Sequence, residues 1–406
     1  MKKGLLVFLV FFIQFSVISQ ITIKGKVLTK SNEILEGASV YLNNTTIGTT
    51  TNEKGEFVLT TPIGSYDLVV SFIGFKTVQY KIDSNSNIGF LEFKLNANTN
   101  ILKEVVIKKT KYDSDWWYNL SQFKQTFLGK TLVASKCKIL NPKVLHFEYD
   151  KKSKVLTAET NKPLKILNKE LGYLIFYDLV HYSLGRKKLS YLGYSRYTKL
   201  KGGKSKQRRW KKKRLKAYNG SRMHFVRSLR KQSLKQEGFV VNQFKRVLNP
   251  NRPTDEQIKR ARNIIEKNKE YLKIYNQAPV NTPLDSAIII LRKRSLPKYT
   301  DYLYKENVPY KDMIKVIEPK VILSFKDYLS VIYLNEKSSF RYKNRLSKKI
   351  KGAYNVQTST VTMLTKNSIL DPTGDIINPL DVFYEGYWSF EQFADTLPLD
   401  YQPPKN

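Results

Sequence analysis

The stretch Gly48-Thr-Thr-Thr-Asn-Glu-Lys-Gly-Glu-Phe57 decides the fold of the N-terminal part of this chain. Its centre, Asn52-Glu-Lys-Gly55, is a turn signal, because Gly55 can take the positive φ that closes a tight hairpin. Short runs on both sides alternate apolar and polar residues, from Ile21-Thr-Ile-Lys24 to Leu91-Glu-Phe-Lys-Leu95, with turn residues between them. This pattern is typical of an antiparallel β-sandwich.

Further segments give this region a family resemblance. Gly25-x-Val27, Leu35-Glu-Gly-Ala-Ser-Val40, Gly48–Phe57 and Ser71-Phe-Ile-Gly-Phe75 together resemble the carboxypeptidase regulatory-like domain. The resemblance implies a transthyretin-like, Greek-key β-sandwich over residues 20–98. Asn100-Ile-Leu-Lys-Glu-Val-Val-Ile107 is similar to the exit segment of this domain where it precedes TonB-dependent receptors of Bacteroidetes. An outer-membrane protein is therefore an expected partner.

The resemblance does not imply peptidase chemistry, since the domain is an accessory to carboxypeptidases. A zinc carboxypeptidase needs a His-x-x-Glu pair and a distant His to hold its metal. The third residue after each histidine of this chain is not a glutamate; the pairs are His146 with Tyr149, His181 with Leu184 and His224 with Arg227. We therefore predict no metal, no cofactor and no catalytic residue.

The N-terminus has the pattern of a secretory signal peptide. Lys2 and Lys3 precede an apolar run from Leu5 to Ile13, and we expect the signal to span residues 1–19. The expected location is the periplasm or the periphery of the outer membrane. Cys137 is the single cysteine, so the chain cannot form an internal disulfide, and its apolar neighbours predict a buried, inert thiol.

The rest of the chain is predicted as a linker at 99–115, an α+β unit at 116–400 and a tail at 401–406. Strand-like runs occupy 144–200 and return beyond Pro297, and a basic helical insertion is expected at about 204–275. Within it, Ser221 is a candidate helix cap, and Thr254-Asp-Glu-Gln257 has the pattern of a capping box. The unit resembles an uncharacterised region that accompanies the first domain in Bacteroidetes, to which no activity is attached.

Positive charge is concentrated in this second part. The chain has a formal net charge of +37, whereas residues 21–98 are neutral, with seven basic and seven acidic residues. No acidic residue occurs between Asp178 and Glu237. The candidate anion-binding residues lie in this tract and are Lys204, Lys206, Arg208, Arg209, Lys211, Lys212, Lys213, Arg214 and Lys216.

The basic tract has two open interpretations, a solvated face or an anion-binding surface. Outside the cytoplasm its ligands would be anionic lipid, lipopolysaccharide or acidic glycan. Nucleic acid is not expected, because the chain is predicted to be exported and carries no recognition motif. The sequence thus favours a non-catalytic envelope protein that acts as a binding or scaffold module.

An envelope hydrolase with dispersed catalytic residues in 110–400 is the alternative function. It would require His146, Glu148 or Asp178 to converge in a pocket. His146 and Glu148 alternate onto one strand face, which is more typical of a structural pair than of a metal site. Asp371-Pro-Thr-Gly-Asp375 lacks the further carboxylates of a calcium loop and is predicted to be an ordinary turn.

Overall fold

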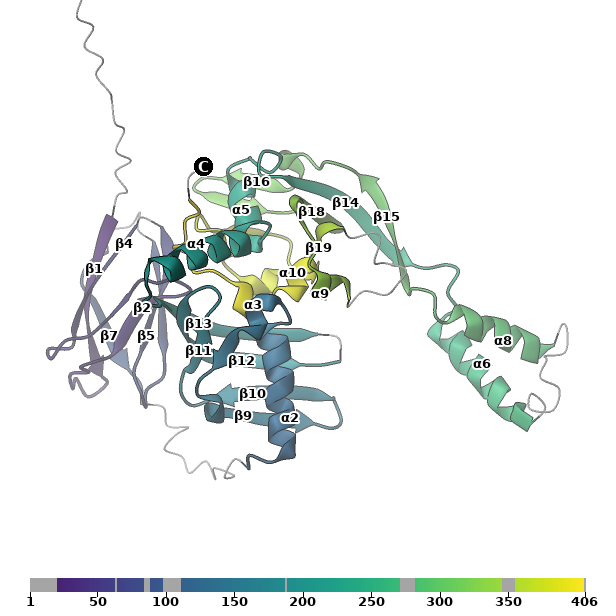
Figure 1. Ribbon diagram of the computed structural model, residues 1–406, viewed down its shortest axis with the longest axis horizontal. Coiled ribbons are helices and arrows are strands. Elements are labelled where there is room, and N and C mark those ends of the chain that lie inside the picture. Colours follow the sequence, from purple (N-terminus) through teal and green to yellow (C-terminus); the bar gives the residue numbers. More distant parts are fainter. Residues whose placement is uncertain are drawn as a thin grey trace, which may run out of the picture.

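The computed structural model describes residues 20–404, except 63, 84–87, 98–110, 187, 271–281 and 345–354. The described chain is mostly β-sheet with several helices, and its sheets belong to three successive parts of the sequence (Figure 1). The predicted signal peptide at 1–19 and most of the predicted linker at 99–115 lie outside the described residues.

The first part is a β-sandwich, as predicted. Its two sheets have the strand orders β4-β1-β7 and β3-β2-β5-β6. In the β1–β4 pairing, Gly25 lies opposite Phe57, and a Cβ on Gly25 would come within 2.3 Å of the Leu91 carbonyl oxygen. Gly55 takes a φ of 72° and closes the predicted hairpin. The strands are β1 (Gln20–Thr29), β2 (Ser39–Leu42), β3 (Gly48–Thr50), β4 (Glu56–Pro62), β5 (Ser65–Ser71), β6 (Val78–Asp83) and β7 (Leu91–Leu95).

The second part is a six-stranded sheet with helices on one face. Trp116, Leu120 and Phe123 from the first helix pack into a core with the inward residues of the sheet. The opposite face of this sheet looks toward the sandwich (Figure 1). The elements are α2 (Ser114–Phe123), η1 (Lys124–Leu128), α3 (Leu132–Ser135), β8 (Cys137–Ile139), η2 (Pro142–Val144), β9 (Leu145–Asp150), β10 (Val155–Thr160), β11 (Leu164–Asn168), β12 (Tyr173–Leu184) and β13 (Leu189–Lys199).

The third part has its own core and two sheets, with strand orders β15-β14-β18-β19-β21 and β16-β17-β20. The helices α6 and α8 form a hairpin that projects from the end of the β14–β15 ribbon (Figure 1). The helices are α4 (Lys204–Tyr218), α5 (Arg222–Arg230), α6 (Asp255–Lys267), α8 (Pro283–Lys293), η3 (Tyr310–Asp312), α9 (Phe340–Lys343), η4 (Pro379–Asp381), α10 (Tyr387–Phe390) and η5 (Phe393–Asp395). The strands are β14 (Phe239–Leu248), β15 (Tyr299–Lys305), β16 (Ile314–Ile317), β17 (Lys320–Leu323), β18 (Tyr328–Lys337), β19 (Val356–Met363), β20 (Ser368–Leu370) and β21 (Val382–Gly386).

The expected helical insertion at about 204–275 was wrong in its middle. Strand β14 interrupts it and pairs with β15 and β18. Phe239, Val241 and Gln243 alternate inward from this strand, which is the period-two signal of a half-buried strand. The alternation is short and lies between two strongly basic helical segments. The helical pattern of these neighbours led to the prediction of helix for the strand as well. The predicted caps are confirmed, since Ser221 caps α5 and Thr254 forms the capping box of α6.

The sandwich is attached to the six-stranded sheet through its β2–β3 loop, Asn43–Ile47. Strand β13 pairs with β12 on one side, and the loop approaches its other edge. The Asn44 N–H donates to the Ser195 carbonyl at 2.8 Å, and the Tyr197 N–H donates to the Thr45 carbonyl at 2.9 Å. The Ser195 hydroxyl donates to Asn44 Oδ1 at 2.6 Å. Thr45 and Ser195 are fully buried, so this contact is part of the protein interior.

The C-terminal segment joins the second and third parts and carries two buried carboxyl groups. Trp388 belongs to the core of the third part, whereas Phe393 belongs to the core of the second. Glu391 lies between these two residues, and Asp395 follows Phe393. Burial raises the pKa values of both carboxyl groups, that of Asp395 to about 7. The Thr131 hydroxyl donates to Asp395 at 2.8 Å, which partly opposes this rise in pKa.

Asn44→Ala is expected to loosen the attachment of the sandwich. Asn44 has a φ of +58°, where alanine is strained by about 1 kcal/mol, and the lost Ser195 hydrogen bond removes about 1 kcal/mol more. Urea unfolding of the whole chain should therefore show a loss of about 2 kcal/mol. Asn44→Gly loses only the hydrogen bond and should fall about halfway, and equal stability of all three proteins would contradict this account of the attachment.

Asp395→Asn is expected to flatten the dependence of stability on pH. The folded-state pKa of Asp395 lies above the ordinary value of a carboxyl group, so the folded chain binds more protons than the unfolded chain between pH 4 and about 7. This contribution to stability is complete below pH 4 and is lost as the pH rises toward 7. Urea midpoints at pH 5 and pH 7.5 should differ less in the variant, whereas Glu53→Gln at an exposed turn should leave the difference unchanged. An unchanged difference in Asp395→Asn would refute the assignment.

Candidate functional site

The basic tract forms helix α4, which is held to the second part by a buried tryptophan. Trp210 is 4% exposed, and its Nε1 donates to the Lys169 carbonyl oxygen at 3.0 Å. Gly172 lies against the indole, and a Cβ there would come within 2.4 Å of the ring. Gly172 also has a φ of 72°, so both the space and the backbone require glycine.

Two cations of α4 take part in this attachment. The Arg214 Nε donates to the Leu171 carbonyl oxygen at 2.7 Å, and its Nη2 donates to the Gly172 carbonyl oxygen at 3.2 Å. The same guanidinium lies 4.3 Å from the centre of the Tyr173 ring. The Lys213 ammonium lies 2.6 Å from a carboxylate oxygen of Glu170. These two side chains therefore contact the protein itself.

The other seven candidate anion-binding residues point into solvent. All seven are exposed, and none forms an ion pair with a described carboxylate; they are Lys204, Lys206, Arg208, Arg209, Lys211, Lys212 and Lys216. Seven exposed cations on one helix give this surface a concentrated positive charge. We call these seven residues the α4 basic face.

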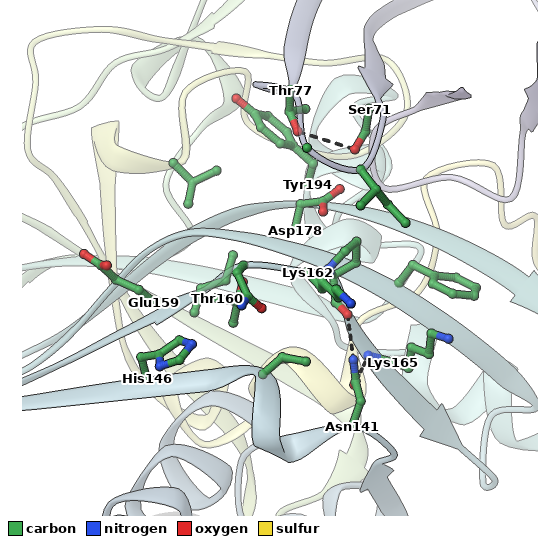
Figure 2. Close-up of a pocket in the computed structure, with 18 of the residues that line it drawn as sticks. Ser71, Thr77, Asn141, His146, Glu159, Thr160, Lys162, Lys165, Asp178 and Tyr194 are labelled. Carbon is green, nitrogen blue, oxygen red and sulfur yellow. Dashed lines mark hydrogen bonds between the residues drawn. The ribbon is translucent and has the colours of Figure 1, made fainter. Parts of the chain in front are cut away.

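A cleft of about 1870 Å³ separates the sandwich from the open face of the six-stranded sheet (Figure 2). One wall comes from the sandwich, chiefly the loop 72–77. The other wall comes from β9 to β13 and the start of α2. Clefts between domains are common binding sites, because each part supplies groups that the other lacks.

A buried contact between the two walls forms the floor of this cleft. The Tyr41 hydroxyl donates to Asp178 Oδ2 at 2.7 Å. The guanidinium of Arg196 lies 5.8 Å from the centre of the Tyr41 ring and 4.9 Å from that of Phe176. Burial raises the pKa of Asp178, while the Tyr41 hydrogen bond and the charge of Arg196 oppose the rise.

The structure brings the three candidate hydrolase residues into one cleft, but at different places in it. His146, Glu148 and Asp178 all line the cleft. Figure 2 shows His146 beside Glu159, its register partner across the β9–β10 pairing, whereas Asp178 lies apart from them near Tyr194. Asp178 is also bonded to Tyr41. The sequence therefore predicted correctly that His146 and Glu148 share one strand face. The three candidate residues do not converge on one point in the cleft.

Sequence reasoning missed Tyr41 and Arg196. The alternation of Tyr194 and Arg196 along a strand could have placed both on one sheet face. Nothing in the local pattern indicates that Tyr41, which belongs to another part of the chain, covers that face. The Asp371–Asp375 segment forms a turn closed by a hydrogen bond of 2.8 Å from the Asp371 N–H to the Asp375 carbonyl, as predicted.

Neither a metal site nor a membrane-spanning helix occurs within the described ranges. They contain no group of three or more His, Cys, Asp or Glu side chains that could hold a metal ion. In the same part of the chain, no helix has the length and apolar character needed to cross a membrane. Burial raises the pKa of the Cys137 thiol to about 12, which keeps it in the unreactive protonated form.

Comparison with known proteins finds similarity in the sandwich. Residues 23–107 match the family described as the CarboxypepD_reg-like domain. The TonB-dependent receptor SusC of Bacteroides thetaiotaomicron is 38% identical over 88 residues, which are 22% of this chain and 8% of the receptor. A crystal structure of a Bacteroides fragilis protein of unknown function, described as membrane-associated, aligns with 90% of this chain and 93% of its own at 9% identity and a TM-score of 0.16. Residues 23–107 are therefore a carboxypeptidase regulatory-like domain, as the sequence predicts.

Proposed function

We propose that this chain is a non-catalytic module of the cell envelope that binds anionic envelope components through the α4 basic face. One observation carries the proposal: α4 uses Lys213 and Arg214 for its attachment to the protein and leaves seven other cations exposed. A helix attached in this way presents its charges at fixed positions. The ligand would be an anionic lipid, a lipopolysaccharide or an acidic glycan.

The similarity of the sandwich supports an envelope location. TonB-dependent receptors that share this domain suggest the periplasm or the periphery of the outer membrane, reached by means of the N-terminal signal. In this proposal the sandwich keeps the Greek-key topology of its family and serves as the scaffold, and the basic helix is the binding element. An outer-membrane protein is the proposed protein partner.

The strength expected of such a surface is enough for reversible binding. Each Lys or Arg close to an anionic membrane contributes about 1 kcal/mol, and the contribution falls off within a Debye length of about 8 Å at physiological salt. Several exposed cations acting together would therefore hold the protein at the surface without a lipid anchor. Added salt would release it.

Replacing Arg208, Arg209, Lys211 and Lys212 by Gln is expected to weaken membrane binding at least tenfold, because four exposed cations are removed. The measurement is co-sedimentation with vesicles of 30% phosphatidylglycerol in phosphatidylcholine, in 50 mM and 300 mM NaCl. The thermal midpoint should not change, since none of the four side chains forms a hydrogen bond or an ion pair with a described residue.

The matched control removes the same charge from the sandwich. Lys24, Lys30, Lys54 and Lys81 are exposed, and their replacement by Gln should leave vesicle binding within twofold of the unmodified protein. Lys213→Gln with Arg214→Gln should instead lower the thermal midpoint, because both side chains secure the helix. Equal binding by the α4 variant and the sandwich variant would refute the proposal.

An envelope hydrolase is the second candidate, and the cleft is the observation that favours it. His146, Glu148 and Glu159 line the same part of the cleft, as a general acid–base pair would require. If the cleft is catalytic, His146→Ala will abolish the hydrolysis of envelope glycans or peptides by the purified chain, and Tyr149→Ala on the same strand will not. Absence of hydrolysis in the unmodified protein, measured by mass spectrometry of digests, would remove this candidate.

A further inference from the structure

Arg196 is held in the cleft by contact with two aromatic rings. Its guanidinium lies over the rings of Tyr41 and Phe176, and its stem packs near Gly48, where a Cβ would lie 3.3 Å from Arg196 Cδ. The side chain is half-buried and lines the cleft. It donates no hydrogen bond to any described residue. A guanidinium is a planar fork of five N–H donors, so such a group is ready to bind an oxyanion.

The docking of the sandwich fixes this arginine in place. The backbone of Arg196 forms a bridge with Thr45, and its neighbours Ser195 and Tyr197 bond to the same loop. The guanidinium lies over both rings, so the side chain would lose little conformational freedom when a ligand binds. Asp178 interacts electrostatically with Arg196 and already accepts a hydrogen bond from the Tyr41 hydroxyl.

A second cation lies in the same row of the sheet. Lys165 on β11 is the register partner of Phe176 on β12, and Phe176 is the register partner of Arg196 on β13. All three line the cleft, which places a lysine and an arginine on either side of one aromatic ring. In Figure 2, Lys165 and Lys162 lie on the opposite side of the view from His146 and Glu159. The cleft is therefore cationic at the end that holds Arg196 and Lys165.

Strand pairing along one edge of β12 is interrupted next to this row. β12 pairs with β10 at Thr157 and with β11 from Leu164, and no pairing with β12 occurs between those positions. The intervening residues line the cleft together with Asp178 and Val180. The register of β12 and β13 also shifts at Leu179. Irregular pairing of this kind is frequent beside binding sites, because it redirects side chains out of the regular pleat.

The other residues that line the cleft indicate which class of molecule would carry an anionic group to Arg196. Hydroxyl side chains contribute to both walls, and amide side chains contribute to the wall of the second part. Phe72 and Phe75 of the sandwich add an aromatic pair with ring centres 5.7 Å apart. An acyl chain would leave the hydroxyl and amide groups of this lining without partners. A peptide that added to the sheet beside Arg196 would need the edge of β13, which the loop Asn43–Ile47 covers. Hydroxyl groups with aromatic faces suit a sugar ring.

We propose that this cleft binds an acidic saccharide. A sugar carboxylate pairs with the guanidinium of Arg196, with Lys165 as the second cation, and the ring lies against Phe72 and Phe75. The planar carboxylate matches the guanidinium fork with two parallel hydrogen bonds. This site differs from the α4 basic face, because it selects by shape and by a single fixed arginine, whereas the helix attracts any anion.

The experiment is calorimetric titration of the full chain with trigalacturonate, with maltotriose as the neutral probe of equal length. Trigalacturonate should bind, and maltotriose should bind at least tenfold more weakly. Arg196→Gln should lower the affinity for trigalacturonate at least tenfold, and Lys165→Gln should lower it severalfold. Lys165 is exposed, so its replacement tests the site even if Arg196→Gln fails to fold.

Two controls separate this site from general attraction to charge. Lys199→Gln removes one cation from the end of β13, outside the cleft lining, and should leave the affinity unchanged. The four-residue α4 variant should also keep the Arg196-dependent binding of trigalacturonate while it loses vesicle binding. Equal binding of maltotriose, unchanged binding by both Arg196→Gln and Lys165→Gln, or loss in the α4 variant would overturn the proposal. Full competition by equimolar inorganic phosphate would overturn the assignment to a saccharide.

Discussion

The hydrogen bonds between the loop Asn43–Ile47 and strand β13 are the contact on which the arrangement of this protein depends. β13 is an edge strand, and an uncovered edge leaves backbone N–H and C=O groups without partners. The loop supplies those partners at Ser195 and Tyr197. The same loop binds the C-terminal segment, since the Leu399 N–H donates to the Asn44 carbonyl at 2.7 Å. One short loop thus joins the sandwich both to the six-stranded sheet and to the C-terminal segment.

This attachment creates the cleft and sets its chemistry. With the loop seated on β13, Tyr41 meets Asp178 and Arg196, which a sandwich held only by a flexible connection would not align. The cleft then contains a carboxylate that accepts a hydrogen bond from Tyr41 and an arginine that donates none to a described residue. This arrangement supports the proposed binding of an oxyanion beside Arg196.

The excess of positive charge is accommodated through backbone carbonyl groups. In the tract without acidic residues, buried arginines cannot find carboxylates nearby in the sequence. Arg214 donates to two carbonyl oxygens, and Arg227 donates to the carbonyl oxygens of Thr373, Leu399 and Tyr401. These bonds satisfy the guanidinium donors and tie distant segments together. Some cations of the tract therefore secure the structure, through carbonyl oxygens or, for Lys213, through a carboxylate, and others are exposed and available to a ligand.

Local pattern in the sequence determined the sandwich, the Gly55 hairpin, the caps at Ser221 and Thr254, and the strand face shared by His146 and Glu148. Each depends on residues within a few positions of one another, where backbone preference and side-chain alternation act directly. β14 was missed because its alternation is short and lies between basic helices. Only the tertiary structure decided which cations of α4 face outward, that Asp178 lies apart from His146, and that Arg196 points into a cleft. These outcomes depend on contacts such as that of Tyr41 with Asp178, which are 137 residues apart in the sequence. Local backbone preferences do not determine which distant surface covers a given strand face.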